Sequence, residues 1–161
     1  MDGSGTRDAR RGKVLNAYLD ASALVSLVLT DAGSIKAREW LQSNRPSLVL
    51  SDFAWGEFTA TLGRDVRSRR LTEVQADQLA GAAREQFAGA AWVGTSTSDI
   101  AAAIRFVSRY SLGLRLPDAI HLAIAQRHGA TLITTDRRQG DAAAALGIGY
   151  VDPTRSPEEA E

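Results

Sequence analysis

The strongest constraint on the fold is an alternation between short apolar runs and longer stretches that carry helix signals. Five runs have the length and apolar character of strands buried on both faces, as in parallel sheets: 14–19, 48–51, 91–94, 131–135 and 149–151. Helices are expected at 35–43, 52–70, 72–88, 99–111, 117–128 and 138–146. This alternation predicts an α/β fold with a mainly parallel five-stranded sheet and right-handed crossovers.

Local residues mark where several of these helices should begin or end. Residues suited to N-caps stand before four of them: Ser34, Asp52, Thr72, and either Ser96 or Ser98. Pro117 fits the first position of the fifth helix, and Gly129 stands where its C-terminal cap belongs. The helices 52–70 and 72–88 follow each other without a strand between them. They are therefore expected to form an αα-hairpin inserted between the second and third strands.

The length of 161 residues corresponds to about one domain. Residues 1–12 and 154–161 contain little that could be buried, so both are expected to be flexible tails around a single domain at 13–153. The apolar share of 44% and the charged share of 24% are those of a globular protein rather than a disordered one.

Composition also excludes several classes of site. The chain has no cysteine, which removes disulfides, thiolate zinc sites, iron–sulfur clusters and cysteine nucleophiles. No run approaches the ~20 apolar residues of a membrane helix, and the first residues lack the apolar segment of a secretory signal. We therefore expect a cytoplasmic protein without a membrane partner. Nineteen basic residues balance nineteen acidic ones, so any nucleic-acid binding must use a local patch.

Four acidic residues stand where strands should end or helices should begin. Asp20 closes V-L-N-A-Y-L-D and Asp136 closes T-L-I-T-T-D, whereas Asp118 opens L-P-D-A-I-H-L-A-I-A and Glu57 lies just inside the helix after L-V-L-S. Open parallel sheets bind ligands beyond the carboxyl ends of their strands, where the strand order reverses. If these carboxylates converge there, they form a cation site.

Each acid also has a purely structural explanation. Asp20 could cap a helix beginning near Ala21, Asp136 could start a turn, and Asp118 and Glu57 lie in first turns, where the helix dipole favours negative charge. The four together are harder to explain in this way, because uncompensated carboxylates in one pocket raise one another's pKa. Basic residues or a divalent cation must offset that repulsion, and an all-oxygen ligand set selects Mg²⁺ or Mn²⁺.

The same residues carry a family resemblance. Y-L-D-A-S-A-L, the glutamate of S-D-F-A-W-G-E-F, L-P-D-A-I-H-L-A-I-A and L-I-T-T-D-R-R resemble, in order, the four motifs of the PIN-domain nucleases. The similarity runs from about Val14 to Pro153, and within that family size and architecture point to the VapC toxins of bacterial toxin–antitoxin pairs. The resemblance implies a PIN-like three-layer fold, with the parallel sheet flanked by helices.

The resemblance further implies an endoribonuclease that depends on Mg²⁺, with Mn²⁺ as a substitute. Asp20, Glu57, Asp118 and Asp136 would then hold one or two ions, with Asp20 and Asp118 as the most probable direct ligands. A bound metal lowers the pKa of its water and neutralises charge on the scissile phosphate. Glu57 or Asp136 would orient the attacking water. In VapC-like proteins a groove takes an antitoxin segment and homodimers are usual, so a VapB-like antitoxin and a second copy are the expected partners.

Other side chains are candidates for supporting roles. Ser22 and Thr134 are expected to hydrogen-bond the carboxylates. Four arginines adjoin the acidic segments or lie near the end of the helix expected at 52–70 and are candidates for RNA backbone contacts: Arg64, Arg115, Arg137 and Arg138. His121 and His128 have no partner at metal-ligand spacing, so we interpret both as structural.

Two alternatives compete with the nuclease interpretation. In a haloacid-dehalogenase-type phosphatase, Asp20 would be the nucleophile, Ser51 would bind phosphate and Asp136 would bind magnesium. That scheme requires a second acid two residues after the nucleophile, where this chain has Ser22, and a suitably placed lysine, which it lacks. The other alternative is a non-catalytic PIN-like binding module that acts through partner contacts alone.

Overall fold

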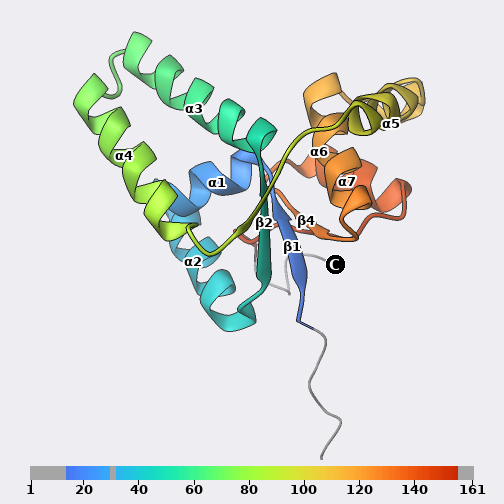
Figure 1. Cartoon of the computed structure of the whole chain (residues 1–161), viewed down its shortest axis with the longest axis horizontal. Helices are drawn as coiled ribbons and strands as arrows, with labels where there is room; N and C mark the ends of the chain where they lie inside the picture. Colours follow the sequence, from blue (N-terminus) through green and yellow to red (C-terminus); the bar gives the residue numbers. More distant parts are fainter. Residues whose placement is uncertain (1–13, 30–31, 156–161) are drawn as a thin grey trace, which may run out of the picture.

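A parallel sheet forms the centre of the computed structural model, which describes residues 14–29 and 32–155 (Figure 1). Within these residues the sheet has five strands in the order β3-β2-β1-β4-β5, and every neighbouring pair is parallel. The strands are β1 (Asn16–Leu19), β2 (Ser47–Ser51), β3 (Ala91–Val93), β4 (Thr131–Ile133) and β5 (Tyr150–Val151). The predicted strands are all present; four of them are shorter than predicted by one or two residues at one end, and β2 begins one residue earlier than predicted.

The predicted tails lie mostly outside the described residues. This applies to all of 1–12, and of 154–161 only residues 154 and 155 are described. Across the described part of the chain, no helix is both long enough and apolar enough to cross a membrane.

Alternate residues of the sheet are buried in two separate cores. On β1, Ala17 and Leu19 belong to one core and Tyr18 belongs to the other, and all three are fully buried. The same alternation divides Leu132 from Ile133 on β4. Because side chains of a strand point to opposite faces in turn, an uninterrupted apolar strand requires a helical layer on each face.

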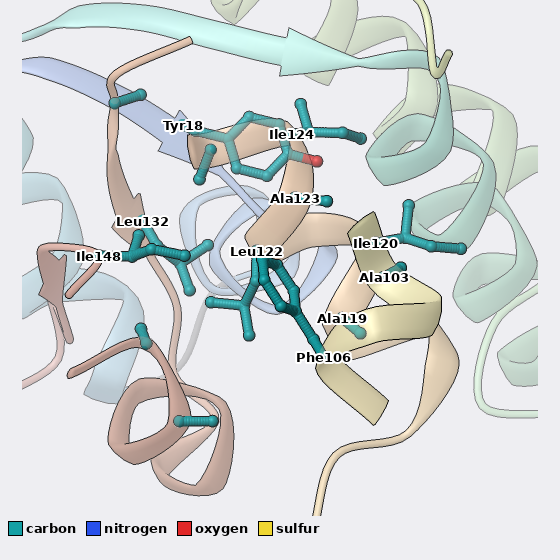
Figure 2. Close-up of a cluster of buried hydrophobic side chains, with 14 of the residues drawn as sticks. Tyr18, Ala103, Phe106, Ala119, Ile120, Leu122, Ala123, Ile124, Leu132 and Ile148 are labelled. Carbon is teal, nitrogen blue, oxygen red and sulfur yellow. The ribbon is translucent and has the colours of Figure 1, made fainter. Parts of the chain in front are cut away.

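Helices cover both faces of the sheet and complete a three-layer α/β fold (Figure 1). The first layer packs on Ala17, Leu19 and Leu50 and consists of α1 (Ala21–Val28), α2 (Ala32–Asn44), α3 (Asp52–Arg67) and α4 (Glu73–Gln86). The second packs on Tyr18 and Leu132 (Figure 2) and consists of α5 (Thr97–Val107), α6 (Leu116–Arg127) and α7 (Arg137–Ala145). The short 3₁₀ helix η1 (Tyr110–Leu112) joins α5 to the segment before α6.

The αα-hairpin is formed by α3 and α4, which project together from the sheet (Figure 1). The guanidinium of Arg84 on α4 lies 4.4 Å from the centre of a Trp55 ring on α3. A cation over the face of a tryptophan is attracted by the ring's quadrupole. This contact adds to the apolar seam between the two helices. The hairpin predicted from the sequence is therefore present, and it carries Glu57 on its first helix.

The first helix of the hairpin differs from the prediction at both ends. Ser51, not Asp52, is the N-cap, and its Oγ accepts the N–H of Ala54 at 3.0 Å. Asp52 is instead the first helical residue, and its carboxylate accepts the N–H and hydroxyl of Thr95. The helix ends at Arg67 rather than Arg70 because Arg69 has a positive φ of 59°.

Other predicted helix boundaries shift by one to four residues. Ser34 lies inside α2 instead of capping it, since α2 begins at Ala32. Of the two candidate serines, Ser96 caps α5, with its side chain accepting the N–H of Asp99. Pro117 is the second residue of α6 rather than the first. Gly129 does take the left-handed conformation predicted for it after α6, at φ 56°, where a Cβ would add strain.

A buried ion pair joins α5 to α6. Asp99 is 1% exposed and accepts hydrogen bonds from Arg127 at 2.7 and 2.9 Å and from the backbone N–H of Ser96 at 2.8 Å. Burial alone would raise the pKa of the Asp99 carboxyl, but the hydrogen bonds from Arg127 and Ser96 lower it below its ordinary value. Arg127 also donates to the carbonyl of Gly94, so one side chain connects α6 to α5 and to the loop before it.

Removing this partner should destabilise the fold. We expect Arg127→Gln to lose about 1–3 kcal/mol of unfolding free energy, because the Asp99 carboxylate stays buried without its cation. The loss should be below that of a fully buried pair, since the Arg127 side chain is 35% exposed. Urea unfolding measures the change. The control is Arg105→Gln, at an exposed position on α5; equal stability of the two variants would contradict the role given to the pair.

Candidate active site

The sheet reverses its strand order between β1 and β4. From β1 the chain builds β2 and β3 on one side, and β4 and β5 lie on the other. Asp20 directly follows β1, and its backbone N–H donates to the carbonyl of Ile133 on β4 at 3.2 Å. Asp136 lies three residues beyond the end of β4. The two aspartates are thus brought to the edge of the sheet at which open parallel sheets bind ligands.

A pocket of about 470 Å³ opens at this edge. All four predicted carboxylates line it, and each comes from a different segment: Asp20 after β1, Glu57 from α3, Asp118 from α6 and Asp136 before α7. The other lining residues are Ala21, Ser22, Ala60, Thr61, Arg64, His121 and Gln139. The structure therefore brings the four acids to one pocket from positions spread over 116 residues of sequence.

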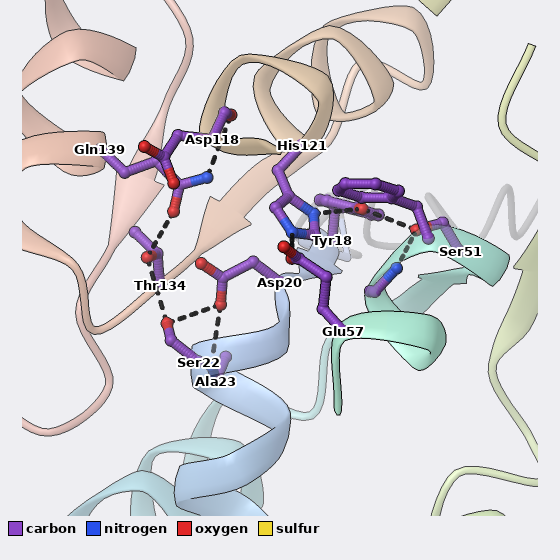
Figure 3. A network of polar contacts seen from close by, with 12 residues as sticks. Tyr18, Asp20, Ser22, Ala23, Ser51, Glu57, Asp118, His121, Thr134 and Gln139 are labelled. Atoms are coloured by element: carbon purple, nitrogen blue, oxygen red, sulfur yellow. Dashed lines mark hydrogen bonds and ion pairs between the residues drawn. The ribbon is translucent and has the colours of Figure 1, made fainter. Parts of the chain in front are cut away.

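Asp20 forms the floor of the pocket and is only 3% exposed. Its Oδ1 accepts the N–H of Ala23 at 2.8 Å, which caps α1, and the hydroxyl of Ser22 at 2.7 Å (Figure 3). Burial raises the pKa of Asp20 above its ordinary value, although these hydrogen bonds act against the rise. Burial thus disfavours the ionised form of Asp20, and a nearby cation would stabilise that form.

Glu57 faces His121 across the pocket (Figure 3). The Nε2 atom of His121 lies 2.6 Å from Glu57 Oε2, and Nδ1 of the same ring lies 2.7 Å from the hydroxyl of Tyr18. His121 is 3% exposed, whereas the Glu57 side chain is 35% exposed and reaches the pocket. The Tyr18 hydroxyl also contacts Ser51 Oγ at 2.8 Å, and burial raises the pKa of Tyr18 above its ordinary value.

Asp118 and Asp136 both accept hydrogen bonds from backbone N–H groups at helix N-termini. Asp118 is half-buried in the first turn of α6, and its Oδ2 accepts the N–H of Arg115 at 3.3 Å. Burial raises the pKa of Asp118, and the charges of Asp136 and Glu57 raise it further. Asp136 is exposed and caps α7, with its Oδ1 accepting the N–H of Arg138 at 2.8 Å. The structural explanation considered for Asp118 is therefore correct, whereas Asp136 caps a helix instead of starting a turn, and both residues still line the pocket.

The donor set of the pocket fits a hard divalent cation. Four carboxylates supply only oxygen atoms, and burial raises the pKa values of Asp20 and Asp118, so a bound cation would stabilise their ionised forms. As the side chains stand, however, no three His, Cys, Asp or Glu residues of the described part of the chain are gathered closely enough to hold an ion. The expected ion-sharing distances are thus not observed, because each acid is turned towards a local hydrogen-bond partner.

The two predicted supporting hydroxyls lie next to each other beside Asp20. Ser22 donates to Asp20, as expected, and its Oγ also accepts the N–H of Thr135 at 2.9 Å. Thr134 Oγ1 lies 3.3 Å from Ser22 Oγ and accepts the N–H of Asp136 at 3.0 Å. Ser22 thus supports a carboxylate directly, whereas Thr134 fixes the backbone that carries Asp136.

The predicted arginines differ in their relation to the pocket. Arg64 lines it from α3, two turns beyond Glu57. Arg115, Arg137 and Arg138 are exposed at the starts of α6 and α7, beside the pocket acids in sequence but not among the lining residues. Arg137 lies 3.9 Å from Asp141. Only Arg64 is therefore placed at the pocket wall.

Comparison with known proteins is consistent with this geometry. Residues 17–145 match the family model of the PIN domain, and this segment includes all four pocket carboxylates. The chain belongs to the PIN domain family. A curated relative of this PIN domain, Ribonuclease VapC46 of Mycobacterium tuberculosis (strain ATCC 25618 / H37Rv), is 31% identical over 140 residues, or 85% of this chain and 97% of the relative.

Several solved structures share the fold of this PIN domain. A toxin–antitoxin complex from Klebsiella pneumoniae is 22% identical, with a TM-score of 0.60 over 85% of this chain and 97% of that one. FitAcB from Neisseria gonorrhoeae is 16% identical, with a TM-score of 0.65 over 87% of this chain and 99% of that one. The resemblance to the PIN-domain family and the predicted three-layer fold are both confirmed.

Three polar residues of this PIN domain were missed by sequence analysis or assigned to other roles. His121 was interpreted as structural, yet it lines the pocket and contacts Glu57. Gln139 is 2% exposed, accepts the hydroxyl of Thr134 and donates to the carbonyl of Asp118, so it joins β4 to α6. Ser51, the phosphate binder of the phosphatase alternative, is fully buried and caps α3, which leaves it no access to a phosphate.

The burial of Asp20 predicts how its charge affects stability. Because its pKa is raised in the folded state, ionisation of Asp20 favours unfolding, and stability falls as pH rises from the ordinary value of about 3.9 towards the raised one. Asn keeps the capping oxygen and removes the charge. We expect Asp20→Asn to be at least as stable as the parent at pH 7 in EDTA, with the difference disappearing near pH 3.

Thermal melts across this pH range measure the effect. The matched control is Asp20→Ala, which removes both the charge and the cap and should be about 1 kcal/mol less stable than Asp20→Asn. A large loss of stability in Asp20→Asn at pH 7 would mean that the ionised carboxylate stabilises the fold, contrary to this account.

Proposed function

We propose that this PIN domain is a metal-dependent endoribonuclease and the toxin of a VapBC-type toxin–antitoxin pair. The observation that carries the proposal is the convergence of Asp20, Glu57, Asp118 and Asp136 on one pocket at the strand-order reversal of a PIN fold. The relative named Ribonuclease VapC46 supports cleavage of RNA as the activity.

Asp20 and Asp118 are the proposed direct ligands of Mg²⁺, for which Mn²⁺ would substitute. They are the two pocket acids whose pKa values burial raises, so they gain most from a bound cation. A divalent ion in this position supplies charge neutralisation at phosphate oxygens and lowers the pKa of a bound water. Ser22 holds the Asp20 carboxylate in place through its hydroxyl.

Glu57 and Asp136 are the proposed groups that orient and deprotonate the attacking water. Both carboxylates are more accessible than Asp20, and both line the pocket. Arg64, at the pocket wall, is proposed to contact the RNA backbone, with Arg115, Arg137 and Arg138 extending that contact along the starts of α6 and α7. Arginine suits this role because its planar guanidinium binds phosphate oxygens in pairs.

The proposed partners are an RNA substrate, a VapB-like antitoxin and a second copy of the chain. Solved structures of the same fold include toxin–antitoxin assemblies, among them VapBC2 from Rickettsia felis bound to a promoter DNA fragment. That similarity supports an antitoxin for this chain. No separate observation favours the non-catalytic binding module.

The proposal predicts a defined cleavage chemistry. Purified, antitoxin-free protein should cleave RNA in Mg²⁺ or Mn²⁺ and stop in excess EDTA, and the products should carry 5′-phosphate and 3′-hydroxyl ends. Ca²⁺ should substitute poorly, because its looser coordination aligns a water less well. Analysis of end-labelled products over a panel of structured and single-stranded RNAs measures this. Cyclic phosphate ends, or cleavage that persists in EDTA, would overturn the proposal.

A pair of charge-matched variants separates the site from contaminating nuclease. Asp118→Asn should lower cleavage at least about 100-fold, as expected when a carboxylate ligand of a catalytic metal is lost. Asp77→Asn makes the same chemical change at an exposed position on α4, far in sequence from the pocket segments, and should retain full activity. Equal activity of the two variants would assign the cleavage to another protein.

A further inference from the structure

A buried chain of polar side chains runs from the start of α3 to the pocket (Figure 3). Ser51 Oγ lies 2.8 Å from the Tyr18 hydroxyl, this hydroxyl lies 2.7 Å from His121 Nδ1, and His121 Nε2 lies 2.6 Å from Glu57 Oε2. Ser51 and Tyr18 are fully buried, and His121 is 3% exposed. This hydrogen-bonded chain joins four elements, β2, β1, α6 and α3, and it ends on a pocket carboxylate.

The two ends of this hydrogen-bonded chain favour one direction for its hydrogen bonds. At one end, Ser51 Oγ already accepts the N–H of Ala54 at 3.0 Å, so its own proton is free to go to the Tyr18 oxygen. At the other end, an ionised carboxylate can only accept, so His121 must present a proton on Nε2. The Tyr18 proton then goes to His121 Nδ1, which accepts it as the unprotonated nitrogen of a neutral ring.

The surroundings of the His121 ring protect its two hydrogen bonds from competition by water. Phe53 meets His121 edge-on, with ring centres 5.0 Å apart, and the Tyr18 ring lies 5.8 Å away. Both rings and the apolar body of α6 remove the imidazole from water. Which ring nitrogen of a histidine carries the proton is set by the hydrogen bond that the other nitrogen makes, and here Nδ1 faces a buried hydroxyl.

We propose that His121 is a positioning residue for Glu57, and that Ser51 and Tyr18 fix its ring as the neutral tautomer with the proton on Nε2. The hydrogen bond from this proton fixes the position of Glu57 Oε2. Within the described residues Glu57 Oε1 has no hydrogen-bond partner, so it is available for chemistry in the pocket. The consequence for cleavage rests on the proposed function, whereas the tautomer and the hydrogen bond to Glu57 do not.

The tautomer can be observed without any activity. The chain contains only two histidines, so ¹⁵N-labelled protein at pH 7 gives few ring signals, and the His128→Gln variant assigns them. We expect His121 to show a protonated Nε2 and an unprotonated, hydrogen-bonded Nδ1. In Tyr18→Phe, which keeps the ring and removes the hydroxyl, the Nδ1 signal should shift. A proton on Nδ1 in the parent, or an unchanged spectrum in Tyr18→Phe, would overturn the proposal.

Cleavage kinetics of variants distinguish a role in positioning Glu57 from a role in the general stability of the fold. Partners that orient active-site ligands typically change activity 10- to 100-fold, so Tyr18→Phe should lower kcat about 10-fold and change the KM for RNA less than about 2-fold. His121→Gln, which keeps an N–H donor near the position of Nε2, should retain more kcat than His121→Leu, which has none. His128→Gln is the control and should match the parent.

The NMR and kinetic experiments can contradict the inference and the proposed function independently of each other. If no RNA is cut under any condition, the proposed function fails and the NMR result alone decides the His121–Glu57 assignment. If RNA is cut but His121→Leu matches the parent in kcat, His121 does not position Glu57 for the reaction, and the inference is overturned while the proposed function stands.

Discussion

Burial of strand β1 on both faces and pairing along both edges is the constraint on which the rest of the structure depends. β1 pairs with β2 on one edge and β4 on the other, and its residues alternate between the two cores. The chain must therefore leave β1 at the strand-order reversal, and Asp20 is the residue at which it does so. The pocket follows from this placement, since the neighbouring segments α3, α6 and the β4–α7 turn all end or begin at the same edge.

Placing several acids at this edge has an electrostatic cost that the fold offsets only in part. Backbone N–H groups at the starts of α1, α6 and α7 each bind one of the acids, and His121 binds another. Burial nevertheless keeps the pKa values of Asp20 and Asp118 raised. A divalent cation would stabilise the ionised forms of these carboxylates in the oxygen-lined pocket. The capping and metal-binding interpretations of these acids are therefore compatible rather than competing.

Much of the fold follows from local sequence. The five apolar runs and the helix signals between them were sufficient to predict the parallel sheet, the αα-hairpin and the edge at which the acids meet. Helix starts were less predictable where adjacent residues compete for the cap. Ser51 and Asp52 are both good N-caps, and the choice between them is made by Thr95, which lies 43 residues away and binds the Asp52 carboxylate.

The role of His121 could not be predicted, because its partners come from packing rather than spacing. Within α6 it stands among apolar residues, which is typical of a core histidine. Its hydrogen-bond partners are Tyr18, 103 residues away on β1, and Glu57, 64 residues away on α3. Gln139 was missed for the same reason, since its amide joins Thr134 to a backbone carbonyl of Asp118. Polar groups buried between elements leave no periodic signal in a sequence.

The central claim is that the four-carboxylate pocket holds a divalent cation, and the anomalous signal of Mn²⁺ in crystals of the protein tests it most directly. Diffraction data from Mn²⁺-soaked crystals, compared with Asp118→Asn crystals treated in the same way, would locate the ion independently of any RNA. The account predicts a Mn²⁺ peak bonded to carboxylate oxygens of Asp20 and Asp118 in the parent, and its loss or marked weakening in the variant. A pocket without a peak at saturating Mn²⁺, or a peak bound only by residues outside the pocket, would contradict it.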